Sequence, residues 1–121
     1  MINHIKRTIS ILAEKLGRNT KNEYVVLSKD DFWGDFLTFE SRVHRSVGMW
    51  YELDYDKDAF TESRSYEYVD SSFEANPCPG GDEQIVTICL TPLKKGRFCI
   101  TEIENFRGER TVKRIHKIWV K

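Results

Sequence analysis

The stretch FLTFESRV, residues 36–43, alternates between two sets of side chains. The set that falls on one face of an extended chain is Leu37, Phe39, Ser41 and Val43, and the other face carries Phe36, Thr38, Glu40 and Arg42. A period of two residues is typical of a β-strand with one face turned toward a core. Residues 49–55 repeat the pattern, and their apolar face is formed by Met49, Tyr51, Leu53 and Tyr55. We therefore predict two strands in this region.

Further β-rich runs follow on both sides of this pair. They cover residues 23–28, 65–70, 84–91, 97–104 and 112–120, and Gly, Pro, Asn, Asp or Ser clusters bound each of them. About seven strands are the number expected of an immunoglobulin-like antiparallel β-sandwich. In the last two runs, Ile100 and Ile103 can share a face only if a β-bulge intervenes.

The N-terminal segment has a different period. Apolar residues alternate at spacings of three and four, at Ile2, Ile5, Ile9, Leu12 and Leu16. This spacing predicts an amphipathic helix over residues 2–16, with Gly17 as its stop. We expect one domain overall, with this helix in residues 1–17 and the sandwich in residues 18–121.

Length and composition exclude several classes of protein. The chain has 121 residues, of which 40% are hydrophobic and 12% aromatic, so a single globular domain is expected and a disordered chain is excluded. Nineteen Lys and Arg residues balance nineteen Asp and Glu residues, which gives no overall attraction to nucleic acid or to an anionic membrane. The sequence shows neither a membrane-spanning run nor a signal peptide, so we expect a soluble, cytoplasmic protein.

The charges are nevertheless unevenly distributed. Residues 51–83 carry ten acidic and two basic side chains, whereas residues 94–121 carry nine basic and three acidic ones. We expect the two regions to neighbour each other in the fold. The basic region also contains Phe106 and Trp119, and a nucleic-acid-binding patch is the weaker reading of it.

No cofactor or metal is predicted. The run from Asp54 to Asp58 resembles the start of a calcium loop, but Ala59 stands where the loop needs glycine and Ser65 where it needs glutamate. The histidines show no zinc-ligand spacing, and no phosphate loop or nucleophile elbow is present. The three cysteines, Cys78, Cys89 and Cys99, are an odd number at wide spacing, as expected of free thiols. We predict that the protein is not an enzyme; a thiol paired with His116 is the open alternative.

Three connections of the predicted sandwich gather at one end of it. They are residues 44–48, 71–83 and 105–111. They contain arginine, aromatic residues and glycine-rich turns, a composition typical of a protein-binding edge.

From Leu37 to Lys121, the order of strands and loops resembles the chagasin-type inhibitors of papain-family cysteine peptidases. The family's first loop, Asn-Pro-Thr-Thr-Gly followed by an aromatic residue and Trp, is matched here by Gly48 and Trp50, with Ser46 and Val47 at the threonine positions. Pro79-Gly80-Gly81 before an apolar strand is similar to the second loop, Lys94-Lys95-Gly96 to a turn of the family, and Arg107 to the third loop.

The resemblance implies an immunoglobulin-like fold whose three loops occlude the peptidase cleft. The residues it implies in partner binding are Arg45, Ser46, Val47, Gly48, Trp50, Pro79, Gly80, Gly81, Phe106 and Arg107. The alternative is a non-inhibitory interaction module, of the immunity or assembly type, that binds its partner through the loops or the N-terminal helix. The oligomeric state is left open.

Overall fold

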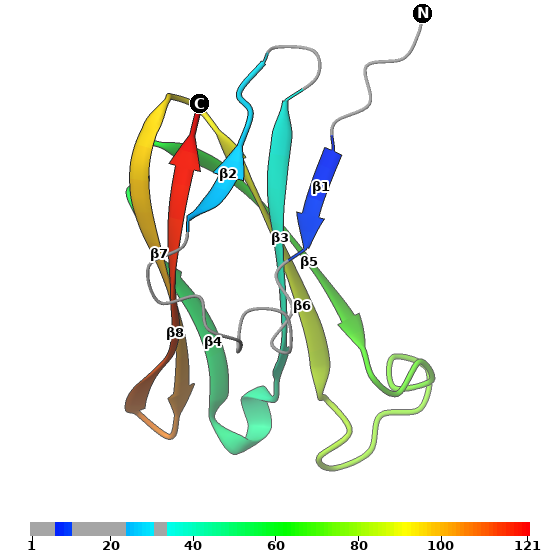
Figure 1. Ribbon diagram of the computed structural model, residues 1–121. Helices are drawn as coiled ribbons and strands as arrows, with labels where there is room; N and C mark the ends of the chain where they lie inside the picture. The colour runs from blue at the N-terminus through cyan, green and yellow to red at the C-terminus, as the bar shows by residue number, and fades with distance from the viewer. Residues whose placement is uncertain (1–6, 11–23, 31–33) are drawn as a thin grey trace, which may run out of the picture.

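The computed structural model describes residues 7–10, 24–30 and 34–121, which form two facing β-sheets (Figure 1). One sheet has the strand order β1-β3-β6-β5 and the other the order β2-β8-β7-β4. The elements are β1 (Arg7–Ser10), β2 (Val25–Leu27), β3 (Asp35–Val43), a 3-10 turn η1 (Arg45–Val47), β4 (Met49–Asp54), β5 (Phe60–Tyr68), β6 (Gln84–Pro92), β7 (Gly96–Phe106) and β8 (Glu109–Val120). Each strand predicted from the sequence is present, several with longer bounds.

The prediction of an N-terminal helix is wrong for residues 7–10, the part of residues 2–16 that the structure describes. Arg7–Ser10 form strand β1, which pairs in parallel with β3. Thr8 and Ile9 are β-branched and fit a strand better than a helix, and an open sheet edge offers backbone partners that override a weak helical pattern. The rest of residues 2–16, Gly17 and the boundary between residues 17 and 18 lie outside the described residues.

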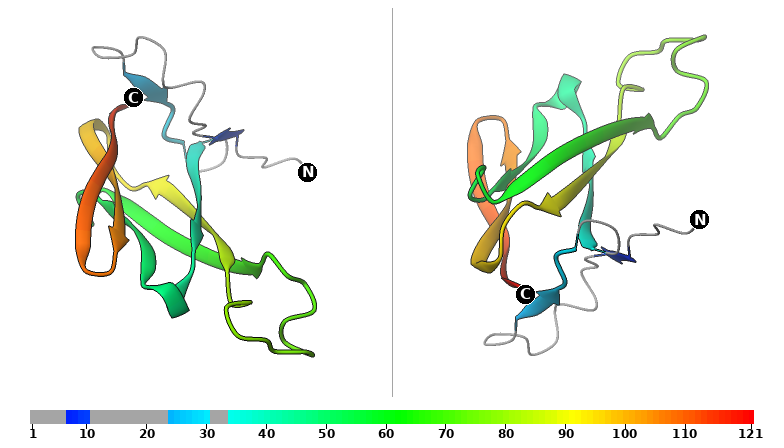
Figure 2. Two further views of the ribbon diagram at one scale, coloured as in Figure 1. Left: turned by 90° about the horizontal axis from the view of Figure 1, so that it is seen from below. Right: turned by 90° about the horizontal axis from the view of Figure 1, so that it is seen from above.

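The prediction of a purely antiparallel sandwich also needs correction. β2 pairs in parallel with β8, as β1 does with β3, while the other pairings are antiparallel. Both exceptions are short strands at a sheet edge (Figure 2).

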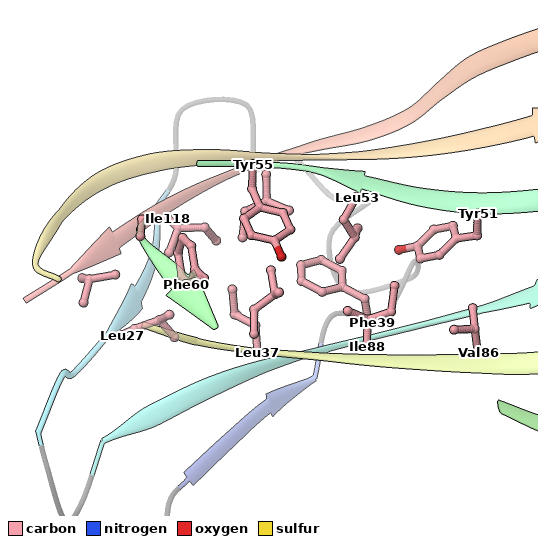
Figure 3. Close-up of a cluster of buried hydrophobic side chains, with 14 of the residues drawn as sticks. Leu27, Leu37, Phe39, Tyr51, Leu53, Tyr55, Phe60, Val86, Ile88 and Ile118 are labelled. Atoms are coloured by element: carbon pink, nitrogen blue, oxygen red, sulfur yellow. The ribbon is translucent and has the colours of Figure 1, made fainter. Parts of the chain in front are cut away.

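The core lies between the two sheets and is built from the faces that the alternation predicted (Figure 3). Leu37 and Phe39 of β3 are fully buried, and they face Tyr51 and Leu53 of β4 across the sandwich. Fully burying one such side chain stabilises a fold by about 1.5–3 kcal/mol, so this alternation fixes which face of each strand turns inward.

The irregularity predicted in the last two strands is present as a shift in strand register. Glu102 pairs with Arg114 but Ile103 pairs with Val112, so Lys113 is the extra residue of a bulge on β8. Ile100 belongs to the core cluster, whereas Ile103 is buried outside it. The two isoleucines are therefore both buried without sharing one packing environment.

A polar network is buried beside this bulge and joins three strands of one sheet. The Tyr51 hydroxyl donates to Glu102 Oε1 at 2.6 Å, and His116 Nε2 donates to Glu102 Oε2 at 2.5 Å. Burial alone would raise the pKa of Glu102, but the hydrogen bonds from His116 and Tyr51 outweigh it and hold that pKa below its ordinary value. The network supports the strands that lead into the loops described next.

Candidate protein-binding edge

Three loops lie together at the end of the sandwich away from the C-terminus (Figure 1). We call them loop 1 (residues 44–48, containing η1), loop 2 (residues 69–83, between β5 and β6) and loop 3 (Arg107 and Gly108, between β7 and β8). Loop 1 lies between the other two. We call the three together the loop end. The gathering predicted from the order of strands is confirmed, although loop 3 is shorter than residues 105–111 because β7 and β8 continue to its tip.

Loop 1 is a tight turn closed by its own backbone. His44 and Met49 exchange two backbone hydrogen bonds, of 2.9 and 3.0 Å, and the N–H of Gly48 donates to the carbonyl of Arg45 at 2.9 Å. Gly48 has φ 75° and ψ 25°, in the left-handed region that favours glycine. The sequence therefore needs glycine at this position to turn the chain back into β4.

Loop 3 is a two-residue hairpin turn. Arg107 has φ 52° and Gly108 φ 86°, and positive φ at both central residues is the mark of a type I′ turn. The side chain of Asn105 accepts a hydrogen bond from the N–H of Gly108 at 3.1 Å. Within the described residues, Arg107 is the one non-glycine residue with positive φ. It holds this position at a conformational cost, and its guanidinium lies 5.1 Å from the ring of the exposed Phe106.

Loops 1 and 3 are joined by their backbones. The N–H of Arg107 donates to the carbonyl of Gly48 at 2.8 Å. A Cβ on Gly48 would lie 3.3 Å from Cγ of Arg107 and 3.4 Å from its backbone. Glycine at position 48 therefore serves both the turn of loop 1 and the close approach of loop 3.

Loops 1 and 2 are joined by the carboxylate of Asp82. The backbone N–H and the hydroxyl of Ser46 donate to its two oxygens at 2.9 and 2.5 Å. His44 Nε2 lies 3.2 Å from Asp82 Oδ1 and donates to the carbonyl of Gly80 at 2.9 Å. The hydrogen bonds from Ser46 are the main reason why the pKa of Asp82 is below its ordinary value. This carboxylate therefore fixes the position of loop 2 against loop 1.

Neither Asp82 nor His44 was among the residues predicted to form the site. Asp82 binds Ser46 across 36 residues of sequence, and a single aspartate after a glycine pair carries no signal of such a partner. The sequence predicted that Ser46 takes part in partner binding. In the structure both its amide and its hydroxyl are already engaged with Asp82, so its side chain positions the loops.

Arg45 and Trp50 form a cluster at the side of loop 1. The Arg45 guanidinium lies 4.7 Å from the Trp50 ring and 5.4 Å from the Tyr66 ring, and the two rings stack at 6.2 Å. Trp50 packs partly against the core. It therefore belongs to the support of the loop end, while Arg45 remains exposed.

Loop 2 presents Pro79 and Gly80 at the surface. Gly80 has φ 76°, and a Cβ there would meet nothing within 4 Å. Gly81 is required for packing instead, because a Cβ on it would lie 2.7 Å from Cys78 Sγ and 3.0 Å from the Phe73 ring. The two glycines, predicted together, thus have different roles: Gly80 permits the turn and Gly81 closes the loop on itself.

The loop end is electrostatically divided. Loop 2 contains four acidic residues and no Lys or Arg, whereas loops 1 and 3 contain Arg45 and Arg107 and no Asp or Glu. Where the acidic and basic regions of the sequence do meet, they form ion pairs, between Arg110 and Glu52 at 3.3 Å and between Lys94 and Asp56 at 3.9 Å. A partner that complements this end has acidic groups opposite loops 1 and 3 and basic groups opposite loop 2.

The catalytic alternative finds no support in the part of the chain that is described. His116 is bonded to Glu102, Cys89 Sγ lies 3.8 Å from the Thr38 hydroxyl, and Cys99 is exposed. Residues 7–10, 24–30 and 34–121 hold no group of three or more metal-ligating side chains. Among the helices formed by these residues, none is long and apolar enough to cross a membrane.

Comparisons with known proteins bear on the fold. No protein-family model and no curated protein matches the sequence. Among solved structures, the crystal structure of the cysteine protease inhibitor EhICP2 from Entamoeba histolytica is similar, with a TM-score of 0.60 at 19% identity over 96% of both chains. The solution structure of amebosin is similar too, with a TM-score of 0.60 at 11% identity over 97% of this chain and 99% of that one.

The TM-scores and the coverage of both chains show a shared fold. The chain has the fold of EhICP2 and of amebosin. The resemblance drawn from the sequence is thus confirmed for the architecture.

Proposed function

We propose that this protein inhibits papain-family cysteine peptidases by inserting its loop end into the substrate cleft. The observation that carries the proposal is the hydrogen-bonded linkage of all three loops, through Gly48 and Arg107 on one side and Ser46 and Asp82 on the other. The shared fold with a cysteine protease inhibitor supports it.

The linkage matters because a loop that is ordered before binding loses less conformational entropy in the complex. Immobilising one flexible side chain at an interface costs about 0.5–1.5 kcal/mol, and ordering a whole loop costs more. In this protein, the backbone turns and the Asp82 carboxylate already hold the loops in place. A larger share of the contact energy then appears as affinity.

The groups available to a partner are those that the internal contacts leave exposed. They are the side chains of Arg45, Phe106 and Arg107 and the turn formed by Pro79 and Gly80. Arginine and aromatic residues are enriched among the residues that dominate binding energy at interfaces. Val47 is half-buried at the centre of loop 1 and adds an apolar contact there. Inhibition by occlusion needs no group that reacts with the peptidase.

The test is the residual activity of papain and of a cathepsin L-like peptidase against rising concentrations of the protein, with trypsin as the control enzyme. We expect reversible, saturable loss of activity for the two cysteine peptidases and none for trypsin. Equal loss for all three enzymes would indicate non-specific interference and would contradict the proposal, as would full activity of both cysteine peptidases.

A matched pair of variants assigns the effect to the loop end. Phe106→Ala with Arg107→Ala removes one exposed apolar side chain and one cation from it. Leu93→Ala with Lys95→Ala removes the same kinds of group from the exposed turn between β6 and β7, at the other end of the sandwich (Figure 1). We expect the first double variant to lose inhibition and the second to retain it.

A further inference from the structure

A second surface lies on the outer face of the sheet β2-β8-β7-β4, at the end away from the loops. We call it the basic aromatic face, and it consists of Tyr24, Arg97, Lys117, Trp119 and Lys121. Trp119 is paired with Arg97 of β7 on one side and with Val26 of β2 on the other. Lys117, Trp119 and Lys121 alternate with the buried His116, Ile118 and Val120, so they point outward together.

The cations of this face are held against its aromatic rings. The Arg97 guanidinium lies 4.8 Å from the centre of the Trp119 ring and 5.5 Å from that of Tyr24. Lys121 Nζ lies 4.4 Å from the Trp119 ring and Lys117 Nζ lies 5.9 Å from the Tyr24 ring. The rings fix the positions of three cations on one surface, because a cation is attracted to the negative face of an aromatic ring.

These three cations have no ion-pair partner in the described part of the chain, unlike several others. Arg42, Lys94, Arg110 and Lys113 each lie within 4.0 Å of a carboxylate. Arg97, Lys117 and Lys121 have no such contact with the described residues. These three cations therefore give this face a local positive charge that no described carboxylate neutralises.

Exposed apolar side chains border the cations. Val26 is 42% exposed and Ile115 is 63% exposed, and Ile115 lies two residues before Lys117 on the same strand. Apolar neighbours favour a partner with apolar side chains of its own. The rings of Tyr24 and Trp119 are already occupied by cations, which disfavours nucleic acid, whose bases need a free ring face for stacking.

We propose that the basic aromatic face binds an extended acidic segment of a partner polypeptide. Lys117 and Lys121 are four strand residues apart, about 14 Å at about 3.4 Å per residue. An extended segment has the same spacing, so carboxylates four residues apart meet both lysines, and a third carboxylate between them meets Arg97. The side chains of the partner segment that alternate with these carboxylates point away from the face or contact the exposed Val26 and Ile115 at its border. The proposal does not depend on peptidase inhibition, because the loop end lies at the other end of the sandwich.

The probe is a short fluorescein-labelled peptide in which Glu alternates with Leu and Thr, and its binding is followed by fluorescence anisotropy. The comparison probes are the same peptide with Gln in place of Glu and a labelled oligothymidylate. We expect the Glu peptide to bind with an affinity that falls as salt rises, and the Gln peptide to bind at least about tenfold more weakly, as the loss of about three exposed ion pairs predicts.

Two triple variants, each of which loses three positive charges, show where the peptide binds. Arg97→Gln with Lys117→Gln and Lys121→Gln should weaken binding by about tenfold or more, whereas Lys94→Gln with Lys95→Gln and Lys113→Gln should leave it unchanged. If the first triple variant unfolds, Lys117→Gln with Lys121→Gln keeps the Arg97 contacts and should still weaken binding several-fold. No binding of the Glu peptide, equal binding of the Gln peptide, equal loss in both triple variants, or tighter binding of the oligothymidylate would each overturn the proposal.

Discussion

The backbone N–H of Arg107 donates a 2.8 Å hydrogen bond to the carbonyl of Gly48, and both residues have positive φ. Loop 1, which links the two sheets, thus meets the β7–β8 hairpin turn where both backbones are in the left-handed region. Glycine adopts this conformation readily, whereas Arg107 is strained in it. Strained backbone positions persist only where the surrounding structure holds them, and they are frequent at binding sites. The contact is therefore a direct target for mutation.

Replacing Gly48 by alanine should weaken the turn and the link to loop 3 together. An L-residue at φ 75° is strained, so we expect the free energy of unfolding to fall by about 1–2 kcal/mol. Gly80→Ala is the matched comparison: Gly80 has φ 76°, so the variant has the same backbone strain, but no atom lies within 4 Å of its added Cβ, and we expect it to lose less stability than Gly48→Ala. Urea denaturation of both variants checks the prediction. A Gly48→Ala protein as stable as the wild type would show that the turn does not need glycine.

Two variants of Arg107 distinguish the effect of its side chain on binding from the effect of its backbone conformation on stability. Arg107→Ala keeps a strained L-residue at φ 52°, so stability should change by less than about 0.5 kcal/mol. Arg107→Gly relieves the strain, and we expect it to be about 0.5–1 kcal/mol more stable. Both should inhibit papain at least about tenfold more weakly, because both lack the guanidinium. Wild-type inhibition by either variant would remove Arg107 from the interface.

Asp82 should act on binding by positioning the loops. Its pKa is depressed, so its carboxylate stabilises the link between loops 1 and 2 at every pH above its ordinary value of about 3.9, and the link is lost only as the pH falls through the lower, folded-state pKa. We expect inhibition by the wild type to persist unchanged from pH 7 to mildly acidic pH. Asp82→Ala should weaken inhibition over this whole range, and Ser46→Ala, which keeps the backbone hydrogen bond, should weaken it less. Loss of wild-type inhibition between pH 7 and 5 by titration of Asp82 would contradict this role.

The buried network around Glu102 should govern the acid stability of the fold. Removing the carboxylate charge in Glu102→Gln disrupts buried hydrogen bonds to Tyr51 and His116, which should cost roughly 2–4 kcal/mol at pH 7. The folded-state pKa of Glu102 is below its unfolded value of about 4.3, so its contribution is present above that value and is lost as the pH falls through the folded pKa. Thermal melts of wild type and variant between pH 7 and 3 should therefore converge as the pH falls. A constant difference across this range would show that Glu102 does not titrate with unfolding.

The strands could be predicted from the sequence because buried and exposed side chains alternate from one residue to the next. Leu37 and Phe39 alternate with polar neighbours, and this alternation is enough to indicate a strand and its inner face. Even the bulge could be anticipated, since Ile100 and Ile103 break the period of two. The N-terminal prediction failed at Thr8 and Ile9 because a helical spacing of isoleucines is also compatible with a strand once a sheet edge is available.

The loop end could be predicted in outline but not in its contacts. Glycine is the usual residue in tight turns, so the local roles of Gly48 and Gly80 follow from residue type. The bonds from Ser46 to Asp82 and from Arg107 to Gly48 join loops far apart in the sequence, and no local pattern encodes such pairs. For the same reason, the sequence did not show that Tyr66, from a strand of the other sheet, stacks on Trp50 beside Arg45.

The most direct test of the proposed function is to map which residues of this protein contact papain. The uniformly ¹⁵N-labelled protein would be titrated with papain whose catalytic cysteine is blocked by a small alkyl group, and the amide signals followed by NMR. The account predicts that signals of residues 44–48, 78–83 and 106–108 shift or broaden, while those of Thr87 on one outer sheet face and Lys117 on the other remain unchanged. Changes confined to the sheet faces, or no change at saturating papain, would contradict it.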